Sequence, residues 1–390
     1  MSKHVLYPYA TTDRQKEILA AIMQHKGMRK AATSLNLSTG TVGNVLTTLK
    51  RRAALKGVAP ENDLNYPLAE GEILIGRSVH TKTPSGDRVW VKTKMEDQHR
   101  LMVMREVVES LKEDLPKYSP MPYGGRGTPE LLNLYVVTDY HLGMKAWHEE
   151  AGEDWDMQIA EQLLLDWLAT AVGHAPEADV AILANLGDLM HWDGYEAVTP
   201  AHKHLLDADT RFQKLVRVAI RTIRQMIDML LHKHKQVHVL MADANHDPAS
   251  GAWLRELLAS VYEDEPRITV DTSADTYYCY EHGSTSLFFH HGHKRGLADV
   301  DRVFAGKYRQ VFGRTKHAYA HLGHLHSNEL KESQLMIVER HRTLAAADAY
   351  AAKGGWISGR EAKVITYSRT DGEVFRISIN PEMAKRGGLA

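Results

Sequence analysis

Beyond residue 130 the chain repeats one pattern, in which a short apolar run is followed by polar residues. Five segments have this form: LLNLYVVTDYH, ADVAILANLGD, KQVHVLMADANHD, TSLFFHHGH and KHAYAHLGHLH. Short apolar runs that end in polar residues predict strands, and amphipathic stretches over 157–172 and 205–234 predict helices between them. Strands alternating with helices predict an α/β sandwich with the helices outside.

The first 57 residues have a helical period instead. Thr12 and Gln15 form a capping box ahead of an apolar stripe, and Gly27 is expected to end this first helix. A second short helix, a turn at Asn36 and Leu37, and a third helix follow. Ser38 is the expected cap of the third helix, whose apolar face consists of Val42, Val45, Leu46 and Leu49. These residues predict a small all-α domain.

The segment between these two regions is polar and broken by prolines. It predicts a linker, a β-hairpin around TPSGD and an amphipathic helix over 98–115, which together suit either a wing or a small connecting domain. Near the end of the chain, Asp371 and Gly372 predict the turn of another hairpin. The expected division is therefore 1–57, 58–130 and 131–390.

The composition is that of a globular protein, with 43% hydrophobic and 25% charged residues among 390. No apolar run has the roughly 20 residues that span a bilayer, so we expect a cytosolic protein of a bacterium or phage-infected cell, without a membrane partner. The single cysteine excludes a cysteine-based zinc cage. Of the 23 histidines, five around the predicted helix 205–234 are expected at the surface: His202, His204, His232, His234 and His238.

Charge is distributed unevenly along the chain. Residues 1–57 hold ten Lys and Arg against two acidic residues, a net charge of +8, whereas the rest of the chain carries −9. Helix, tight turn and a third helix with a small polar first turn resemble a helix-turn-helix DNA-binding module. The alternative is a three-helix bundle with a solvated basic face. The candidate DNA-binding residues are Arg29, Lys30, Ser38, Thr39, Thr41, Asn44, Lys50, Arg51 and Arg52.

The polar residues at the predicted strand ends are those that bind metals. They form D-x-H, G-D, N-H-D, H-G and G-H-x-H motifs, at Asp139 and His141, Asp188, Asn245 to Asp247, His291, and His324 and His326. In an extended segment alternate side chains leave on one side, so each D-x-H or H-x-H pair is expected to face one cleft. Oxygen ligands mixed with imidazoles suit Mn²⁺, Fe²⁺ or Zn²⁺ better than Ca²⁺ or Mg²⁺ alone.

These five motifs, in this order, resemble the calcineurin-like metallophosphoesterase superfamily over roughly residues 131–330. The resemblance implies a two-sheet sandwich and two divalent ions, with Mn²⁺ favoured over Fe²⁺, Zn²⁺ or Mg²⁺. It implies one ion on Asp139, His141, Asp188 and His326, and the other on Asp188, Asn245, His291 and His324. A hydroxide that bridges the ions would attack the phosphoester. His246 would face the phosphate, with Asp247 orienting its ring.

The sequence departs from the family pattern in places. Ala244 replaces the usual glycine before N-H-D, and His290 and His293 compete with His291, which is chosen because it precedes Gly292. His191 replaces an aspartate of the Ser/Thr protein phosphatases, which disfavours that activity. Instead, GDLMH and ANHDP resemble SbcD-like DNA repair nucleases. His191 is then a residue beside the substrate or behind the ligands, or else a loop histidine.

Three functions follow for testing. The first is a DNA nuclease or phosphodiesterase delivered to DNA by the N-terminal domain. The second is a phosphoesterase for a small phosphoester, cyclic nucleotide or phosphoprotein, which the acidic charge of the larger part favours. The third is a non-catalytic DNA-binding regulator with a structural metal site. The overall arrangement resembles phage-encoded proteins, and such DNA-binding modules often form homo-oligomers.

Overall fold

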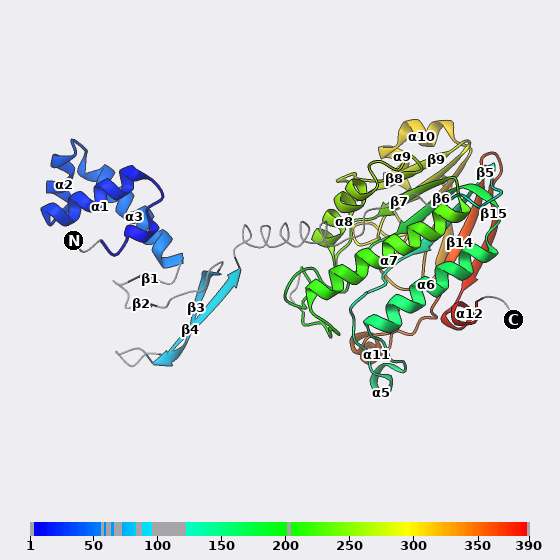
Figure 1. Ribbon diagram of the computed structural model, residues 1–390, viewed down its shortest axis with the longest axis horizontal. Helices are drawn as coiled ribbons and strands as arrows, with labels where there is room; N and C mark the ends of the chain where they lie inside the picture. The colour runs from blue at the N-terminus through cyan, green and yellow to red at the C-terminus, as the bar shows by residue number, and fades with distance from the viewer. Residues whose placement is uncertain are drawn as a thin grey trace. The chain divides into compact units, whose positions relative to one another are not determined.

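The chain forms two compact units, Met1–Glu113 and Asp114–Ala390 (Figure 1). The computed structural model describes residues 4–55, 58–59, 64–65, 72–82, 88–95, 122–200 and 204–387. The predicted helix over 98–115, His202 and most of the predicted linker lie outside these residues. Within them, none of the helices is long and apolar enough to cross a membrane.

Three helices pack together at the start of the chain, as predicted. They are α1 (Asp13–His25), α2 (Met28–Ser34) and α3 (Thr39–Leu55), preceded by the short η1 (Tyr7–Tyr9). The hydroxyl of Thr12 accepts a hydrogen bond from the Gln15 amide, and that of Ser38 accepts one from the Thr41 amide at 3.0 Å, which confirms both predicted caps. Buried Ile18, Leu19, Ala32, Val42 and Leu49 hold the helices together.

The residue that ends α1 differs from the prediction. Lys26 adopts the left-handed conformation at the end of α1, with φ of 50°, whereas Gly27 is extended and precedes α2. Gly27 is therefore the boundary before the second helix and not the terminator of the first. Asn36, also left-handed with φ of 53°, makes the predicted turn between α2 and α3.

Two antiparallel pairs follow the helices in the first unit. The longer pair, β3 (Glu72–Lys82) with β4 (Arg88–Met95), is the hairpin predicted around TPSGD. The shorter pair joins β1 (Val58–Ala59) and β2 (Leu64–Asn65).

The second unit contains two mixed sheets, and the predicted two-sheet α/β fold is confirmed. The six-stranded sheet has the order β15-β14-β5-β6-β7-β8, in which β5 to β8 are parallel and β14 and β15 are antiparallel. Its strands are β5 (Thr128–Val137), β6 (Ala178–Asn185), β7 (Gln236–Met241), β8 (Ile268–Val270), β14 (Ala362–Ser368) and β15 (Gly372–Ile379). The predicted hairpin is formed by β14 and β15, but its turn covers residues 369–371, so Gly372 is the first residue of β15 and pairs with Ser368.

The second sheet has five strands in the order β12-β13-β11-β10-β9. Strands β10, β11 and β13 run parallel, and β9 and β12 are antiparallel edges. The strands are β9 (Tyr278–His282), β10 (Thr285–Phe289), β11 (His317–Leu322), β12 (Glu329–Glu332) and β13 (Ile337–Arg340).

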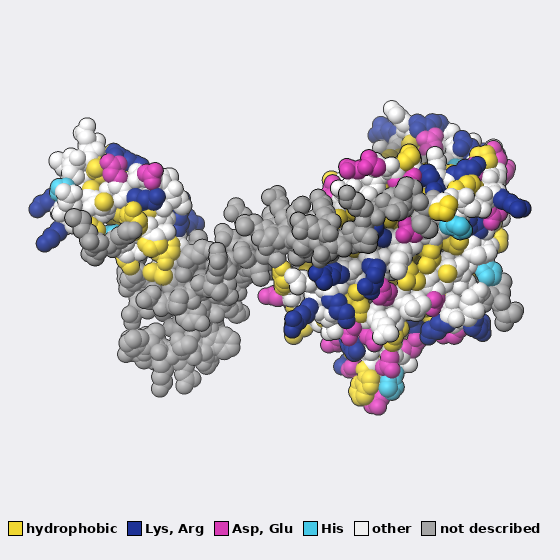
Figure 2. Space-filling model, in the orientation of Figure 1, with side chains coloured by type: hydrophobic (Ala, Val, Ile, Leu, Met, Phe, Trp, Pro, Cys, Tyr) yellow, Lys and Arg dark blue, Asp and Glu magenta, His cyan; other side chains and the backbone are white. Residues whose placement is uncertain are grey.

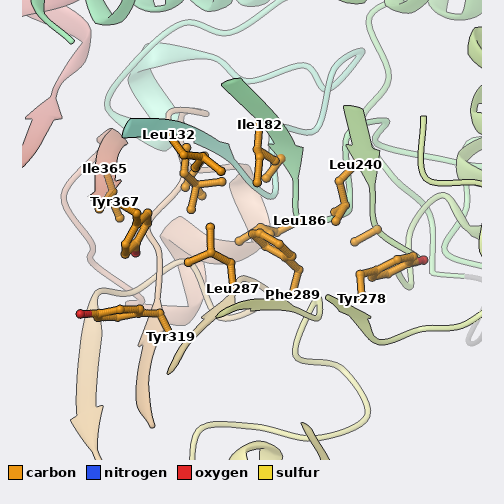
Figure 3. Close-up of a cluster of buried hydrophobic side chains, with 14 of the residues drawn as sticks. Leu132, Ile182, Leu186, Leu240, Tyr278, Leu287, Phe289, Tyr319, Ile365 and Tyr367 are labelled. Atoms are coloured by element: carbon orange, nitrogen blue, oxygen red, sulfur yellow. The ribbon is translucent and has the colours of Figure 1, made fainter. Parts of the chain in front are cut away.

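The main core lies between the two sheets (Figure 3). Leu132, Ile182 and Leu240 of the first sheet face Leu287 and Phe289 of the second, and all five are at most 1% exposed. All eight residues of β6 are buried because helices cover the other face of this sheet.

Helices cover both outer faces. The first sheet carries α6 (Met157–His174), α7 (Phe212–Lys233), α8 (Pro248–Val261) and α12 (Pro381–Arg386), with α6 and α7 side by side (Figure 1). The second sheet packs its outer face against α9 (Val300–Lys307) and α10 (Arg309–Arg314). Two short helices, α5 (His148–Ala151) and α11 (Ala349–Gly354), contact each other. Helix α7 begins seven residues later than predicted, and Leu205 is 90% exposed in the loop before it.

Two of the five histidines that were expected at the surface are buried or half-buried. His204 and His232 are exposed, but His234 is fully buried. Its Nδ1 donates to the carbonyl oxygen of Ala178 at 2.7 Å, and its Nε2 lies 3.0 Å from the Tyr135 hydroxyl. His238 is half-buried in β7, beside the ring of Tyr280. The prediction was wrong for both because the helix ends at Lys233 and the chain enters β7, an interior strand of the sheet, at Gln236.

Candidate metal centre

The metal-competent residues of the second unit follow the carboxyl ends of five strands. Strands β5, β6 and β7 are adjacent and parallel, so their ends lie at one edge of the sheet. The loops after them are hydrogen-bonded to one another, as in the bond from the Asp139 amide to the Gly187 carbonyl at 2.9 Å. The loops after β10 and β11 are joined similarly, from the Gly323 amide to the His291 carbonyl at 2.8 Å.

The backbone at these residues is not extended. Five candidate ligands have positive φ between 48° and 75°: Asp139, His141, Asp188, His324 and His326. The side chains of the D-x-H and H-x-H pairs do meet at one place, but not because they alternate along extended strands. Each strand ends before its ligands, and left-handed turns aim their side chains. Non-glycine residues in this region cost about 1–3 kcal/mol each and are concentrated at functional sites.

Asp139, His141 and His326 form the first group, with ligand atoms within 4.8 Å of one another. Asp139 Oδ2 accepts hydrogen bonds from the Thr138 hydroxyl at 2.5 Å and from the His324 amide at 2.8 Å. Its other oxygen, Oδ1, is buried, accepts no hydrogen bond from the described residues and lies 3.3 Å from His326 Nε2. A buried carboxylate oxygen without a donor costs about 1–3 kcal/mol, so this atom fits a cation.

Asp188, His291 and His324 form the second group under the same limit of 4.8 Å. The backbone amides of Asn245 and His246 donate to Asp188 Oδ1 at 3.1 and 2.8 Å, which leaves Oδ2 facing His291 Nε2 at 3.2 Å. Asn245 Oδ1 lies 2.9 Å from the same nitrogen.

His291 is oriented as metal-binding histidines usually are. Its Nδ1 donates to the carbonyl oxygen of Leu186 at 3.0 Å, which fixes the tautomer and aims Nε2 at the centre. The same Nε2 is 4.0 Å from Asp139 Oδ1, so the two groups adjoin. Gly187 allows this packing, since a Cβ there would lie 2.6 Å from Ala244 Cβ and 2.8 Å from His291 Nδ1.

The charges of the two groups stabilise one another. Burial alone would raise the pKa of Asp188, but His291 lowers it below its ordinary value, and His326 does the same for Asp139. Burial likewise opposes protonation of His291, yet Asp188 and Asp139 raise its pKa to about 9. Before a metal binds, a proton on His291 balances part of the carboxylate charge.

A third cluster of rings lies beside the first group. His246 Nδ1 donates to the carbonyl oxygen of His191 at 3.0 Å, and its ring centroid is 4.8 Å from that of His141. Asp247 is buried and accepts a hydrogen bond from the Met190 amide at 2.8 Å. The Nδ1 of His246 therefore contacts the His191 carbonyl and not Asp247, which was expected to orient the His246 ring.

His191 is not a solvated loop histidine. Its side chain is stacked on His246 at an interplanar angle of 17°, and its Nδ1 lies 3.4 Å from His141 Nδ1. It is 2% exposed, and burial lowers its pKa to about 3, so the ring is neutral at pH 7. The short GDLMH segment was the only sequence signal for this position.

The other competing histidines lie outside both groups. His290 Nδ1 donates to the carbonyl oxygen of Thr276 at 2.8 Å, and its ring stacks on Tyr277. The ring of His293 is 5.3 Å from that of His291 and 6.4 Å from that of His324. Of the three, only His291 contributes a ligand atom to the second group.

Most candidate DNA-binding residues of the first unit are exposed. Some of them have structural contacts: Ser38 caps α3, its hydroxyl lies 2.8 Å from that of Thr41, and half-buried Arg52 donates to the Thr11 hydroxyl at 2.8 Å. The exposed ones are Arg29, Lys30, Thr39, Thr41, Asn44, Lys50 and Arg51, together with Ser38.

No family model and no curated protein matches this sequence. Solved structures that match include a predicted phosphoesterase of Streptococcus pneumoniae, at 12% identity over 64% of this chain and 98% of that one, with a TM-score of 0.25. An archaeal phosphodiesterase matches at 11% identity over 63% and 99%, with a TM-score of 0.31. A dimetal phosphatase of Danio rerio matches at 7% identity over 64% and 98%, with a TM-score of 0.33.

Proposed function

We propose that the second unit is a phosphoesterase that uses two divalent metal ions. The carrying observation is the pair of adjoining ligand groups, between which the buried Asp139 Oδ1 has no hydrogen-bond donor among the described residues. One ion would be held by Asp139, His141, Asp188 and His326, and the other by Asp188, Asn245, His291 and His324. The mixture of carboxylate, amide and imidazole donors suits Mn²⁺, with Fe²⁺ and Zn²⁺ as alternatives.

Bound ions at such a site activate a water molecule and neutralise phosphoryl oxygens. The chain itself supplies the fixed positions of the ligands. Asp188 is held by two backbone amides, and His291 by the Leu186 carbonyl, so neither has to reorganise when the site is loaded. The proposed role of His246 is to donate a proton from Nε2 to the leaving oxygen, with the His191 carbonyl holding Nδ1.

The proposed substrate is a DNA phosphodiester. The net charge of +8 over residues 1–57, and the arrangement of α2, a tight turn and α3 with exposed small polar residues, support a DNA-binding first unit. A second candidate is a small phosphoester, because the remaining 333 residues carry −9 and a surface that grips DNA is usually basic.

The test is hydrolysis by Mn²⁺-loaded protein of single- and double-stranded DNA, bis-p-nitrophenyl phosphate and p-nitrophenyl phosphate. In Asp188→Asn we expect fewer than two bound metals per chain and a loss of about a thousandfold or more in kcat/KM, because several kcal/mol of charge stabilisation are removed. Asp264→Asn, at an exposed position of the same unit, is the matched control.

Cleavage of DNA that depends on Asp188 supports the nuclease. Cleavage of the small esters alone moves the function to the second candidate. Full activity and two metals in Asp188→Asn would exclude a bridging role for this carboxylate.

A further inference from the structure

Helix α7 presents one row of basic side chains on its outer face. Lys214, Arg217, Arg221 and Arg224 are separated by three or four residues, and at 100° per residue they fall within an arc of about 80°. The opposite face of the helix is apolar and buried, from Phe212 to Leu231. We call these four residues the α7 stripe, and Figure 2 shows Lys and Arg side chains gathered over this helix.

The stripe has a single sign in a unit that is otherwise acidic. Asp228, the one acidic residue of α7, lies in the same arc one turn beyond half-buried Arg224; it is itself half-buried, and burial raises its pKa against the effect of Arg224. Glu161 of α6 binds the guanidinium of Arg221 through two hydrogen bonds of 2.7 and 2.6 Å. Stripes of one sign create an attractive potential for polyanions even on a protein whose net charge is negative.

One end of the stripe reaches the edge of the sheet that carries the metal centre. Gly143, two residues beyond His141, accepts a hydrogen bond from the Asp209 amide at 2.9 Å, just ahead of α7. The side chain of Leu215, which follows Lys214, lies 3.0 Å from where a Cβ of Gly143 would be. The first turn of α7 therefore packs directly behind the loop that contains His141.

We propose that the α7 stripe binds the phosphate backbone of duplex DNA and directs it to the metal centre. From Lys214 to Arg224 the helix rises about 15 Å, which matches the axial span of about four phosphates of one strand. Single strands are bound through aromatic platforms as well as charge. The only aromatic residue of α7, Phe212, is buried, so the stripe fits a duplex backbone. This assignment of the substrate rests on the proposed phosphodiesterase function.

The test uses the full chain carrying Lys214→Glu, Arg217→Glu and Arg224→Glu, with Arg221 kept because it binds Glu161. The control variant has the same change in charge elsewhere in the second unit, with Glu in place of exposed Arg302, Arg309 and Lys316. A variant with Gln at the three stripe positions removes the positive charges without reversing them, and thermal unfolding of each variant verifies the fold. Binding of a 30-base-pair duplex is followed in EDTA by fluorescence anisotropy between 50 and 200 mM salt.

We expect the stripe variants to bind the duplex at least about tenfold more weakly. Their log–log salt slope should fall by up to about 2.7, because each phosphate contact contributes about 0.9. With Mn²⁺, kcat/KM for duplex cleavage should fall while hydrolysis of bis-p-nitrophenyl phosphate is unchanged. If the wild-type chain does not hydrolyse the ester, the proposed function is contradicted. The binding measured in EDTA then still tests whether the α7 stripe binds duplex DNA.

Equal affinity and equal salt slope in the stripe and control variants would overturn the proposal and make the stripe an ordinary solvated face. An equal loss of affinity for a single-stranded 30-mer would overturn the assignment to duplex DNA.

Discussion

His246 is the proposed general acid, although with His141 and His191 it also forms a further group that could hold a metal. It donates to the His191 carbonyl and lies beside His141, yet it belongs to neither of the two groups that join Asp139 with His326 or Asp188 with His324. In His246→Ala we expect both metals to remain and kcat to fall by about 10²–10⁴, the usual contribution of a general acid. Metal analysis of the purified variant beside a rate measurement separates the two roles.

His204→Ala, which removes an exposed histidine of the same unit, is the control for this experiment. Loss of a metal from His246→Ala would make His246 a ligand and contradict the proposed scheme.

The raised pKa of His291, at about 9, predicts that metal binding releases a proton. The ligand nitrogen must be unprotonated, so at pH 7 the incoming ion displaces the proton that Asp188 and Asp139 stabilise. Apparent metal affinity should therefore rise with pH up to about 9. Titration calorimetry at pH 7 in buffers of different ionisation enthalpy measures the protons released, and none released would contradict the protonated state of metal-free His291.

The sequence alone predicted which side chains would lie together at the candidate centre but not how they are aimed. Asp139, His141, His324 and His326 were expected to alternate along strands, and left-handed turns place them instead. His191 and His234 are buried through contacts with residues far away in the chain, such as His246 and Tyr135. A period in the sequence carries no information about such partners, so these two environments could not be predicted.

At the level of secondary structure, strands β11, β13, β14 and β15 share a buried polar network. Glu339 of β13 binds Lys363 of β14 at 2.6 Å and Arg376 of β15 at 3.0 Å, and the Lys363 and Glu339 side chains are 4% and 3% exposed. His321 and His341 complete a further group of metal-competent residues with Glu339. Two cationic side chains already neutralise this carboxylate, so we interpret the group as a structural ion-pair network.

Lys363→Met should destabilise the second unit by about 3–5 kcal/mol, the usual cost of removing one partner from a buried pair. The pKa of Glu339 is lowered by His341 and Lys363 against the effect of burial, so its ionisation stabilises the fold above the ordinary carboxyl pKa. This contribution is lost as the pH falls below about 4.3, and the variant should show less loss on acidification than the wild type. Denaturant unfolding at pH 7 and pH 4 measures both effects.

Glu339→Gln combined with Lys363→Met completes a double-mutant cycle. Recovery of part of the lost stability in the double variant is expected. Additive losses would mean that the pair does not interact. This network was not predicted from the sequence, since its members come from four strands.

Most secondary structure elements were predictable because their apolar runs are uninterrupted. Strand β6 is buried at every position and α6 begins at the predicted Met157, whereas the start of α7 was placed in a loop that contains the exposed Leu205. The end of α1 at Lys26 was not predicted, because glycine is the usual left-handed residue after a helix and Gly27 is adjacent.

For the whole molecule, the separation of charge between the two units predicts a division of labour. The first unit should add affinity for DNA to that of the α7 stripe, and the second unit should carry out the hydrolysis. The full chain with Glu in place of Lys30, Lys50 and Arg51, all exposed, should bind duplex DNA with a salt slope reduced by up to about 2.7 while hydrolysing bis-p-nitrophenyl phosphate at the wild-type rate. Arg52 is kept because it supports the start of α1 through Thr11.

The charge-matched control for this variant has Glu at Arg302, Arg309 and Lys316 of the second unit. An unchanged salt slope in the first-unit variant would make the basic helices a solvated surface or a protein contact. A reduced slope with slower ester hydrolysis would contradict the separation of roles, since charges of the first unit would then affect hydrolysis itself. A reduced slope with normal ester hydrolysis is the result that a separate DNA-binding unit requires.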